Sequence, residues 1–414
     1  MMRSMFSGVS GLKAHQLQMD VIGNNISNVN TIGFKSSRVT FQEIYSQTLK
    51  SATGPSTGGR GGSNPHQVGL GVAVGTVDVL HTRSGAQRTD KATDLSIEGD
   101  GFFIVSDGVS NYYTRAGNFD LDRLGNLTAP GGLTVMGWRA GEPTSLAPRA
   151  INLAGLHMSA RQTDALNFNG NLNADSEDGH IENYTISLYD SLGREHKVDL
   201  EFQKTSTNAW AVNSISIDDQ QISITNAILE GEPIFNPIDI TFNTDGSLDI
   251  GAFNNIIVSF ADNSAEDMNI AIDFTRLTQS SGNTNVRGEQ LGGYTAGVID
   301  SINIDSNGVV TGLYTNGQAQ TEWVISMANF TNPAGLVKLG NNLFEQTTNS
   351  GTADLGTAGS GGRGVLNPGS LEMSNVDLGK EFTDMIIAQR GFQANSRIIT
   401  TSDELLQELV NLKR

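Results

Sequence analysis

The sequence contains no cysteine, which excludes disulfides, thiol catalysis, iron–sulfur clusters and cysteine-ligated zinc. Aromatic residues make up only 7% of the chain, too few to favour the sugar-stacking cleft of a glycosidase. No apolar run approaches the ~18 residues of a membrane-spanning helix. The first residues lack a charged segment followed by an apolar core and a small-residue cleavage site, so we expect no cleaved signal peptide. These absences fit either a cytosolic protein or one exported by a route without such a signal.

Basic residues are also scarce, and acidic residues are concentrated in the middle of the chain. The 414 residues include 26 Lys/Arg and 44 Asp/Glu, a formal net charge of -18. Residues 61–360 carry 14 of the former and 35 of the latter, so the charge belongs to the body rather than the ends. A nucleic-acid surface needs clustered basic side chains, so we expect no nucleic-acid partner. The length predicts two to four domains.

Proline is absent from the first 54 and the last 46 residues, and these two stretches carry the long helical patterns. Apolar residues recur every seven positions in both, which is typical of helices that supercoil around a partner. We predict that the two ends pair, with 1–30 and 370–414 forming an inner helical coiled-coil domain. The predicted assembly residues are Met5, Val9, Leu12, Met19, Ile22 and Ile26 at the front, and Leu371, Leu378, Phe382, Met385, Gln389, Arg390, Phe392, Asn395, Ile399 and Leu406 at the back.

Between the ends the pattern is that of strands and turns. Residues 184–274 alternate apolar and polar side chains in short runs separated by turn residues, as in sandwiches or barrels. The sequence around Gly99-Asp100-Gly101 predicts a hairpin. The predicted fold class is therefore mainly β with terminal α-helices, with discontinuous β-rich outer domains added to the helical domain.

Two Gly-rich segments, 53–65 and 349–364, predict flexible hinges. They lead to a domain assignment in four parts. Residues 31–93 and 356–369 are predicted as a linker region with these hinges. Residues 94–155 and 288–355 are predicted as a first β-rich outer domain, and 156–287 as a second one inserted into it.

Motifs that would carry chemistry are weak. Gly359-x-Gly361-x-x-Gly364 has the letters of a dinucleotide fingerprint, but it lies in a Gly-rich segment and Pro368 follows. Residues 303–308 imitate the start of a calcium loop, yet Tyr314 occupies the position of the bidentate Glu, so a hairpin turn is favoured. The six histidines are scattered. We therefore expect no catalytic residue, no cofactor, no metal and no small-molecule substrate.

The two ends resemble the signatures of the bacterial flagellar rod and hook axial protein family. The N-terminal match includes Asp20, Asn24, Asn25, Asn28, Asn30, Thr31, Gly33, Phe34 and Lys35. The C-terminal match includes Ser374, Asn375, Val376, Asp377, Met385, Gln389, Arg390, Phe392, Ala394, Asn395 and Arg397. Residues 94–155 and 288–355 resemble the hook branch, and the length of the inserted segment also favours that branch over rod subunits.

This resemblance implies a structural, non-enzymatic subunit that self-assembles into a curved, flexible tube, the flagellar hook, which transmits torque from rod to filament. It implies partners in the distal rod protein, the hook cap protein, the hook–filament junction protein and the export apparatus, besides copies of the chain itself. It also implies an extracellular location reached without a cleaved signal peptide. The terminal helices would gain order on assembly, because short amphipathic helices are marginal alone. The alternatives are a distal rod or junction protein, or a secreted β-rich adhesin.

Overall fold

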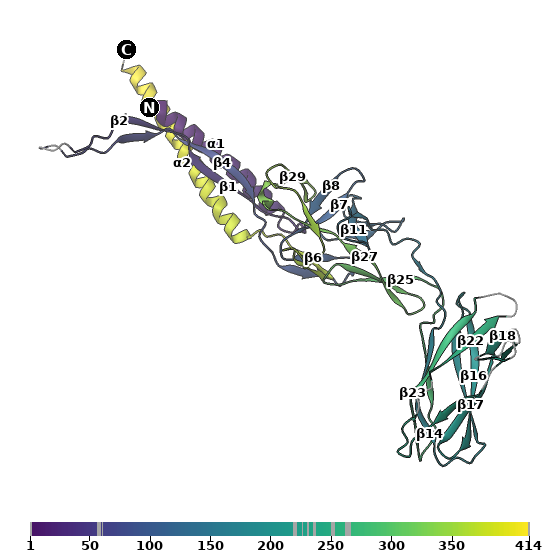
Figure 1. Cartoon of the computed structure of the whole chain (residues 1–414). Helices are drawn as coiled ribbons and strands as arrows, with labels where there is room; N and C mark the ends of the chain where they lie inside the picture. Colours follow the sequence, from purple (N-terminus) through teal and green to yellow (C-terminus); the bar gives the residue numbers. More distant parts are fainter. Residues whose placement is uncertain are drawn as a thin grey trace. The chain divides into compact units, whose positions relative to one another are not determined.

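The chain divides into two compact units, described here from a computed structural model (Figure 1). Unit 1 comprises Met1–Ala154, Ile302–Thr311 and Thr321–Arg414, and unit 2 comprises Gly155–Ser301 and Gly312–Gln320. The structure describes residues 2–55, 59, 61–217, 222–225, 227–229, 232–234, 237–249, 253–260 and 266–412.

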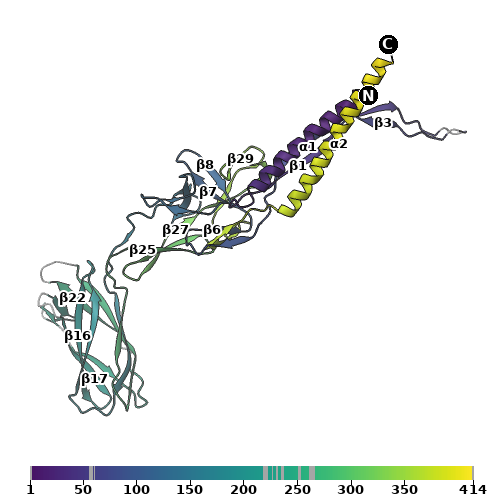
Figure 2. The same cartoon turned by 180° about the vertical axis from the view of Figure 1, so that it is seen from behind.

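Two helices lie at the chain ends, as the proline-free stretches predict. Helix α1 runs from Met2 to Ser27 and helix α2 from Leu378 to Asn411. Figures 1 and 2 show them side by side and antiparallel. Helix α2 begins at its N-cap Asp377, whose carboxylate accepts hydrogen bonds from the backbone N–H groups of Gly379 and Lys380. The fold class, mainly β with a helix at each end, is confirmed.

The predicted start of the C-terminal helix is wrong. Leu371 does not lie in the helix but in strand β33 (Ser370–Glu372), where it pairs with Gln87 of β5 (Ala86–Arg88) and is buried. The seven-residue step from Leu371 to Leu378 therefore joins two different elements. A buried strand and a helix both place an apolar residue at such a spacing, so periodicity alone cannot separate them.

Unit 1 is otherwise built from short antiparallel strands. The main sheet of the chain has the order β13-β25-β26-β27-β11-β7-β8-β30-β29, with β9, β10, β12, β28 and β31 paired off this path. Of these strands, β13 (His157–Met158), residues 297–301 of β25 and residues 312–314 of β26 are counted in unit 2. The bounds of these strands are β7 Phe102–Ser106, β8 Asn111–Thr114, β9 Asp120–Leu121, β10 Leu127–Thr128, β11 Thr134–Arg139, β12 Arg149–Ala150, β25 Gly297–Ile304, β26 Val309–Tyr314, β27 Ala319–Ile325, β28 Met327–Asn329, β29 Val337–Gly340, β30 Leu343–Glu345 and β31 Asp354–Gly356. A 3₁₀ turn, η1, spans Pro333–Gly335.

The hairpin predicted around Gly99 and Gly101 is wrong. Strand β6 (Leu95–Glu98) pairs with β32 (Val365–Pro368), whereas β7 joins the main sheet. The two glycines instead allow a close approach, because a Cβ at Gly99 would lie 2.4 Å from the Cα of Gly364. Strands from the front and the back of the sequence thus meet here.

The segment 31–93, predicted as a linker, folds largely into one long hairpin. Strand β1 (Ser37–Glu43) pairs with β4 (Val72–Val79), and β2 (Ser46–Lys50) pairs with β3 (His66–Gly69). The Gly-rich segment 53–65 lies at its tip, where Thr53 bridges Ser63, and 56–58 and 60 lie outside the described residues. A hairpin tip leads the chain back to where it started, so this segment cannot act as a hinge between domains.

The second predicted hinge, 349–364, is also tied into unit 1. Its strand β31 pairs with β28, and the Arg363 guanidinium lies 2.9 Å from an Asp354 carboxylate oxygen. The same guanidinium donates to the backbone carbonyl of Thr357, and the Gly364 N–H donates to the backbone carbonyl of Asp100. These bonds hold the Gly-rich loop at both ends, which corrects the prediction of a free hinge.

Unit 2 contains two sheets that share one hydrophobic core. The five-stranded sheet has the order β18-β22-β23-β14-β24 and the four-stranded one β15-β16-β17-β21. Leu166 and Phe168 of one sheet pack with Leu200 and Trp210 of the other. The strands of unit 2 are β13 His157–Met158, β14 Ala165–Asn173, β15 Ile181–Tyr189, β16 Glu195–Ser206, β17 Ala209–Ile217, β18 Ile222–Thr225, β19 Ala227–Leu229, β20 Glu232–Ile234, β21 Ile238–Thr241, β22 Phe253–Phe260, β23 Met268–Ser280 and β24 Arg287–Leu291.

One turn design recurs in both units. In the loops that begin at Asp122, Asp190 and Asp305, the carboxylate accepts the backbone N–H groups two and four residues later. Each loop has a glycine at its fourth position with φ between 74° and 81°, a conformation that suits glycine best. Hydrogen bonds to the carboxylate hold the pKa of Asp122 below its usual range. The hairpin turn expected at 303–308 is confirmed.

Candidate self-association site

The seam between α1 and α2 is made of small and polar side chains. On α2 the buried positions are Glu381, Ala388 and Ser402, and Asn395 continues the same seven-residue step. On α1 the facing surface includes Gly8, Gly11 and Ala14. A Cβ at Gly11 would lie 2.7 Å from Asn395 Nδ2, and one at Gly391 would lie 2.6 Å from His15 Nε2. The two helices approach closely because Gly11 and Gly391 carry no side chain.

A hydrogen-bonded node fixes one end of this seam. Asn25 is buried, and its Nδ2 donates to a Glu381 carboxylate oxygen at 3.1 Å and to the Ser37 carbonyl at 2.8 Å. Its Oδ1 accepts the Ser37 N–H at 3.0 Å. Burial raises the pKa of Glu381, and its neighbours Asp384 and Asp377 act in the same direction. The node therefore joins α1, α2 and the first strand through one amide side chain.

The predicted apolar heptads flank this seam instead of forming its centre. Met385, Phe392, Ile399 and Leu406 are half-buried, as are Met5, Leu12, Met19 and Ile26, while Ile22 is buried and Val9 exposed. Leu378 and Phe382 are exposed on α2, and so are Gln389 and Arg390. The hydrophobic stripe was readable from the sequence, and Asn395 beside it was among the predicted assembly residues. Glu381 and Ser402, which keep the same seven-residue spacing, were not predicted.

Several large apolar side chains on α2 are exposed. Phe382 is 51% exposed, Ile386 59% and Ile387 58%, and further exposed apolar residues follow toward the C-terminus at Ile398 and Leu405. On α1, Phe6 is 65% exposed. The outer part of the 37–79 hairpin adds Tyr45, Leu49, Val68 and Leu70, which are also exposed. Adjacent exposed apolar residues of this kind mark interaction surfaces.

The N-terminal signature residues serve a different purpose from the stripe: they end α1 and dock the chain onto the sheet. Asn28 bonds back to Asn24 and accepts from Thr31, which closes the turn after the helix. Gly33 has φ 67° and leaves no room for a Cβ, which would lie 2.7 Å from Ala116 N. Its N–H donates to the Glu372 carbonyl at 2.8 Å. Asp20 and Asn30 are exposed.

Directly after this turn, Phe34 and Lys35 are buried. The Lys338 ammonium lies 4.0 Å from the centroid of the Phe34 ring. Lys35 Nζ lies 2.6 Å from Glu372 Oε1 and donates to the Thr82 carbonyl at 2.8 Å. Arg115 lies 3.5 Å from the other Glu372 oxygen. Burial lowers the pKa of both Lys35 and Arg115, while Glu372 opposes this shift in each.

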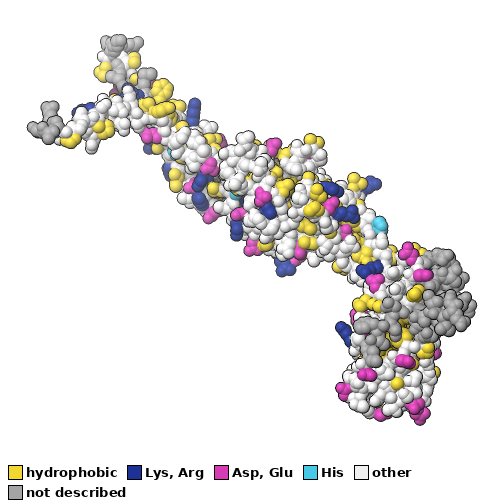
Figure 3. Space-filling model, in the orientation of Figure 1, with side chains coloured by type: hydrophobic (Ala, Val, Ile, Leu, Met, Phe, Trp, Pro, Cys, Tyr) yellow, Lys and Arg dark blue, Asp and Glu magenta, His cyan; other side chains and the backbone are white. Residues whose placement is uncertain are grey.

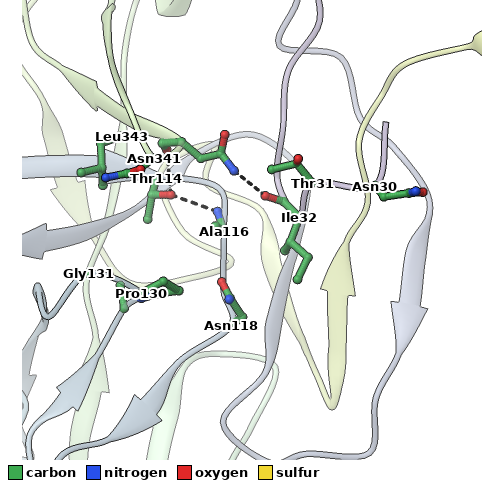
Figure 4. Close-up of a pocket in the computed structure, with 12 residues that line it drawn as sticks. Asn30, Thr31, Ile32, Thr114, Ala116, Asn118, Pro130, Gly131, Asn341 and Leu343 are labelled. Atoms are coloured by element: carbon green, nitrogen blue, oxygen red, sulfur yellow. Dashed lines mark hydrogen bonds between the residues drawn. The ribbon is translucent and has the colours of Figure 1, made fainter. Parts of the chain in front are cut away.

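We call the contact between the turn after α1 and the sheet, with Phe34, Lys35 and Glu372, the junction. A cavity of about 490 Å³ lies beside it (Figure 4). Asn342 donates to the Ile32 carbonyl, and the Thr114 hydroxyl accepts the Ala116 N–H. The lining carries amides, a few hydroxyls and apolar groups but no titratable side chain: Asn30, Thr31, Ile32, Thr114, Ala116, Asn118, Ala129, Pro130, Gly131, Asn341, Asn342 and Leu343. General acid–base chemistry needs a group that can exchange a proton, and this cavity provides none.

Two further features of the described residues bear on function. Among the described residues, no cluster of three or more His, Asp or Glu is arranged to hold a metal ion. Neither helix, over its described residues, is long and apolar enough to cross a bilayer. Exposed apolar side chains thus lie on both helices and on the long hairpin, next to the junction.

Comparison with known proteins gives four family matches. They are "Flagella basal body rod protein" at residues 5–35, "Flagellar hook protein FlgE/F/G D1 domain" at 96–183, "Flagellar basal body protein FlaE D2 domain" at 157–294 and "Flagellar basal body rod FlgEFG protein C-terminal" at 367–412. These matches cover both ends and most of the middle.

Similar proteins cover the full chain. The chain is 39% identical to the flagellar hook protein FlgE of Borreliella burgdorferi, over 100% of each chain. It is 35% identical to the flagellar basal-body rod protein FlgG of Bacillus subtilis, also over 100% of each. The crystal structure of Helicobacter pylori flagellar hook protein FlgE2 matches with a TM-score of 0.50 at 14% identity, covering 69% of this chain and 100% of that one. That last likeness concerns the fold.

Proposed function

This chain belongs to the flagellar rod and hook protein family and is a structural subunit of the flagellar hook, and from that premise we propose that it works by stacking with copies of itself into a curved, flexible tube that transmits torque from rod to filament. The observation that carries the proposal is the exposed apolar surface of α2. Phe382, Ile386 and Ile387 lie outside the seam with α1 and are free to contact other copies.

The energetics favour such an arrangement. Small and polar residues form the centre of the α1–α2 seam, and large apolar side chains of α2 such as Phe382 and Ile386 stay exposed beside it. Burial of an exposed Phe or Ile side chain contributes about 1.5–3 kcal/mol. Contacts between copies therefore add to the stability that the seam supplies, so the paired helices of a free copy gain further order on assembly.

The proposed assembly residues are the two stripes and their exposed neighbours. On α1 they are Met5, Val9, Leu12, Met19, Ile22 and Ile26. On α2 they are Leu378, Phe382, Met385, Phe392, Ile399 and Leu406, with Gln389, Arg390 and Asn395 on the same helix. Leu371 is not among them, because it is buried in β33. The exposed apolar residues of the 37–79 hairpin provide a second contact surface.

The chain is placed in the hook and basal body by its relatives. Beyond that, we propose that it leaves the cell through the flagellar export apparatus without a cleaved signal, and that its ends meet the distal rod, hook cap and hook–filament junction proteins. The proposed role is structural and requires no catalysis. The absence of cysteine supports the proposed export, because folding outside the cell then needs no oxidant.

A second candidate is a distal rod subunit, because a basal-body rod protein is 35% identical over the whole chain. The two candidates differ in the shape of the polymer. A hook subunit forms curved tubes, whereas a rod subunit forms straight ones. Negative-stain electron microscopy of polymers of the purified chain distinguishes them.

The same polymers test the assembly surface. We expect Phe382→Ser/Ile386→Ser to raise the critical concentration for polymerisation at least ~10-fold, because two apolar contacts per copy are lost. Val109→Ser is the matched control, since Val109 is 93% exposed at the β7–β8 turn and lies on neither helix. Circular dichroism at 222 nm checks that the helices persist. Equal critical concentrations for both variants would show that α2 does not form the contact.

A further inference from the structure

The two units carry very different charges. Unit 2 contains 6 Lys/Arg and 22 Asp/Glu, a net charge of -16, whereas unit 1 contains 20 and 22, a net charge of -2. Nearly all of the net charge of -18 therefore belongs to the inserted unit. One of its six basic side chains, Lys204, is buried and donates at 2.6 Å to the carbonyls of Ala174 and Ser176.

Part of this charge is gathered at one end of unit 2. The loops after β14 and β21 meet there, since the Gln279 N–H donates to the Gly246 carbonyl and Ser281 donates to Asp175. Exposed carboxylates in these loops include Glu177, Asp178 and Asp249. Figure 3 shows Asp and Glu side chains gathered at the lower end of this unit.

The exposed apolar side chains are distributed in the opposite way. Most of the large ones described lie in unit 1, on the helices, on the 37–79 hairpin and at isolated turns. In unit 2 they are scattered singly over different strands and turns: Ile181, Leu192, Ile257, Leu291, Val298 and Leu313. The surfaces that can attract another copy thus belong to unit 1, and the charge that repels it belongs to unit 2.

We infer that unit 2 is an electrostatic spacer that opposes self-association, so that copies assemble through unit 1 only when the carboxylates of unit 2 are screened. This rests on the proposed self-assembly. Repulsion between like-charged bodies rises with the square of their charge and falls over the Debye length, ~10 Å at 0.1 M salt and ~3 Å at 1 M. Free copies are therefore kept apart in dilute salt, and the threshold for assembly depends on ionic strength.

The spacer also selects its neighbours. A second copy of unit 2 brings a charge of the same sign, so direct contact between the two is opposed unless cations lie between them.

The test removes three charges from the full-length chain. Glu177→Gln/Asp178→Asn/Asp249→Asn lowers the charge of unit 2 from -16 to -13, so the repulsion falls by about a third. The matched control, Glu98→Gln/Asp120→Asn/Glu345→Gln, removes three exposed carboxylates from unit 1. Light scattering measures the critical concentration of each chain between 20 mM and 1 M NaCl, and circular dichroism verifies that all three are folded.

We expect the unit 2 variant to assemble at a concentration at least ~3-fold lower than the wild type at 20 mM NaCl, with the control within ~1.5-fold of the wild type. At 1 M NaCl the three chains should agree, because screening is then nearly complete. Equal salt dependence in the unit 2 variant and the wild type, or an equal effect of the control, overturns the spacer while leaving self-assembly intact. A wild-type chain that does not assemble at any salt concentration removes both proposals.

Discussion

Two glycines of α1 offer a controlled test of how the terminal helices pair. Gly11 faces α2, and a Cβ there would lie 2.7 Å from Asn395 Nδ2 and 2.9 Å from its Cγ and Oδ1. Gly23 lies on the same helix, with nothing within 4 Å of the corresponding position. Substitution by alanine raises intrinsic helix propensity by about 1 kcal/mol at either site. Only Gly11→Ala also forces atoms together at the seam.

The expected results therefore differ in sign. Gly23→Ala should stabilise the helix pair by about 1 kcal/mol. Overpacking costs about 1–3 kcal/mol, so Gly11→Ala should be neutral to destabilising by about 2 kcal/mol, despite the same gain in propensity. In an Asn395→Ala background the obstructing amide is gone, and Gly11→Ala should then stabilise like Gly23→Ala.

The assay is thermal unfolding followed by circular dichroism at 222 nm, at a protein concentration below that needed for polymerisation. Hydrogen exchange of the α1 amides gives an independent reading, since protection reports local opening of the pair. The reasoning is refuted if Gly11→Ala is as stabilising as Gly23→Ala, or if Asn395→Ala does not change its effect. Either result would mean that the helices do not pack in this register in the free chain.

Three further predictions concern the junction, the seam and a turn. Lys35→Met should destabilise unit 1 by about 3–5 kcal/mol in urea unfolding because it leaves Glu372 buried without its ammonium, whereas Lys35→Arg should cost less because it keeps a positive charge beside Glu372. Burial raises the pKa of Glu381 in the folded chain, so the helix pair should gain stability as the pH falls from 7 through that pKa; Glu381→Gln should melt higher at pH 7 and lose this dependence. Gly125→Ala should destabilise more than Gly131→Ala in thermal melts: both have positive φ, but only at Gly125 would a Cβ meet backbone, 2.5 Å from Ala154 N.

The sequence predicted the fold class and the two helices because long proline-free heptads and alternating strands leave strong periodic signals. It misplaced Leu371 because an apolar residue seven positions before Leu378 fits a strand as well as a helix. It named Asn395 but missed Glu381 and Ser402, because polar residues at a seven-residue spacing do not look like a buried stripe. Small and polar residues become a seam only when the partner helix supplies glycines, and no local pattern contains that information.

The two predicted hinges were wrong, and the ion pairs around Glu372 were not predicted, for a related reason. A Gly-rich segment looks the same at the tip of a hairpin, in a braced loop and in a linker, because composition does not reveal which strands pair. Arg115 and Glu372 are 257 positions apart in sequence and gave no local signal, yet they lie 3.5 Å apart in the junction. The turn that begins at Asp305 was readable, because the hydrogen bonds to its carboxylate lie within five residues.

The pairing of early and late strands in unit 1 has a consequence for the order in which the chain can fold. Strands β5 and β6 find their partners in β33 and β32, and Lys35 finds its counter-ion in Glu372. A chain that emerges from a narrow channel with its N-terminus first can form the local hairpins and close unit 2 on the way. Unit 1 stays open until residues 365–372 arrive. Completion of the fold thus reports that nearly the whole polypeptide has been delivered, and a prematurely ended chain would be left with unpaired strand edges and an uncompensated buried lysine.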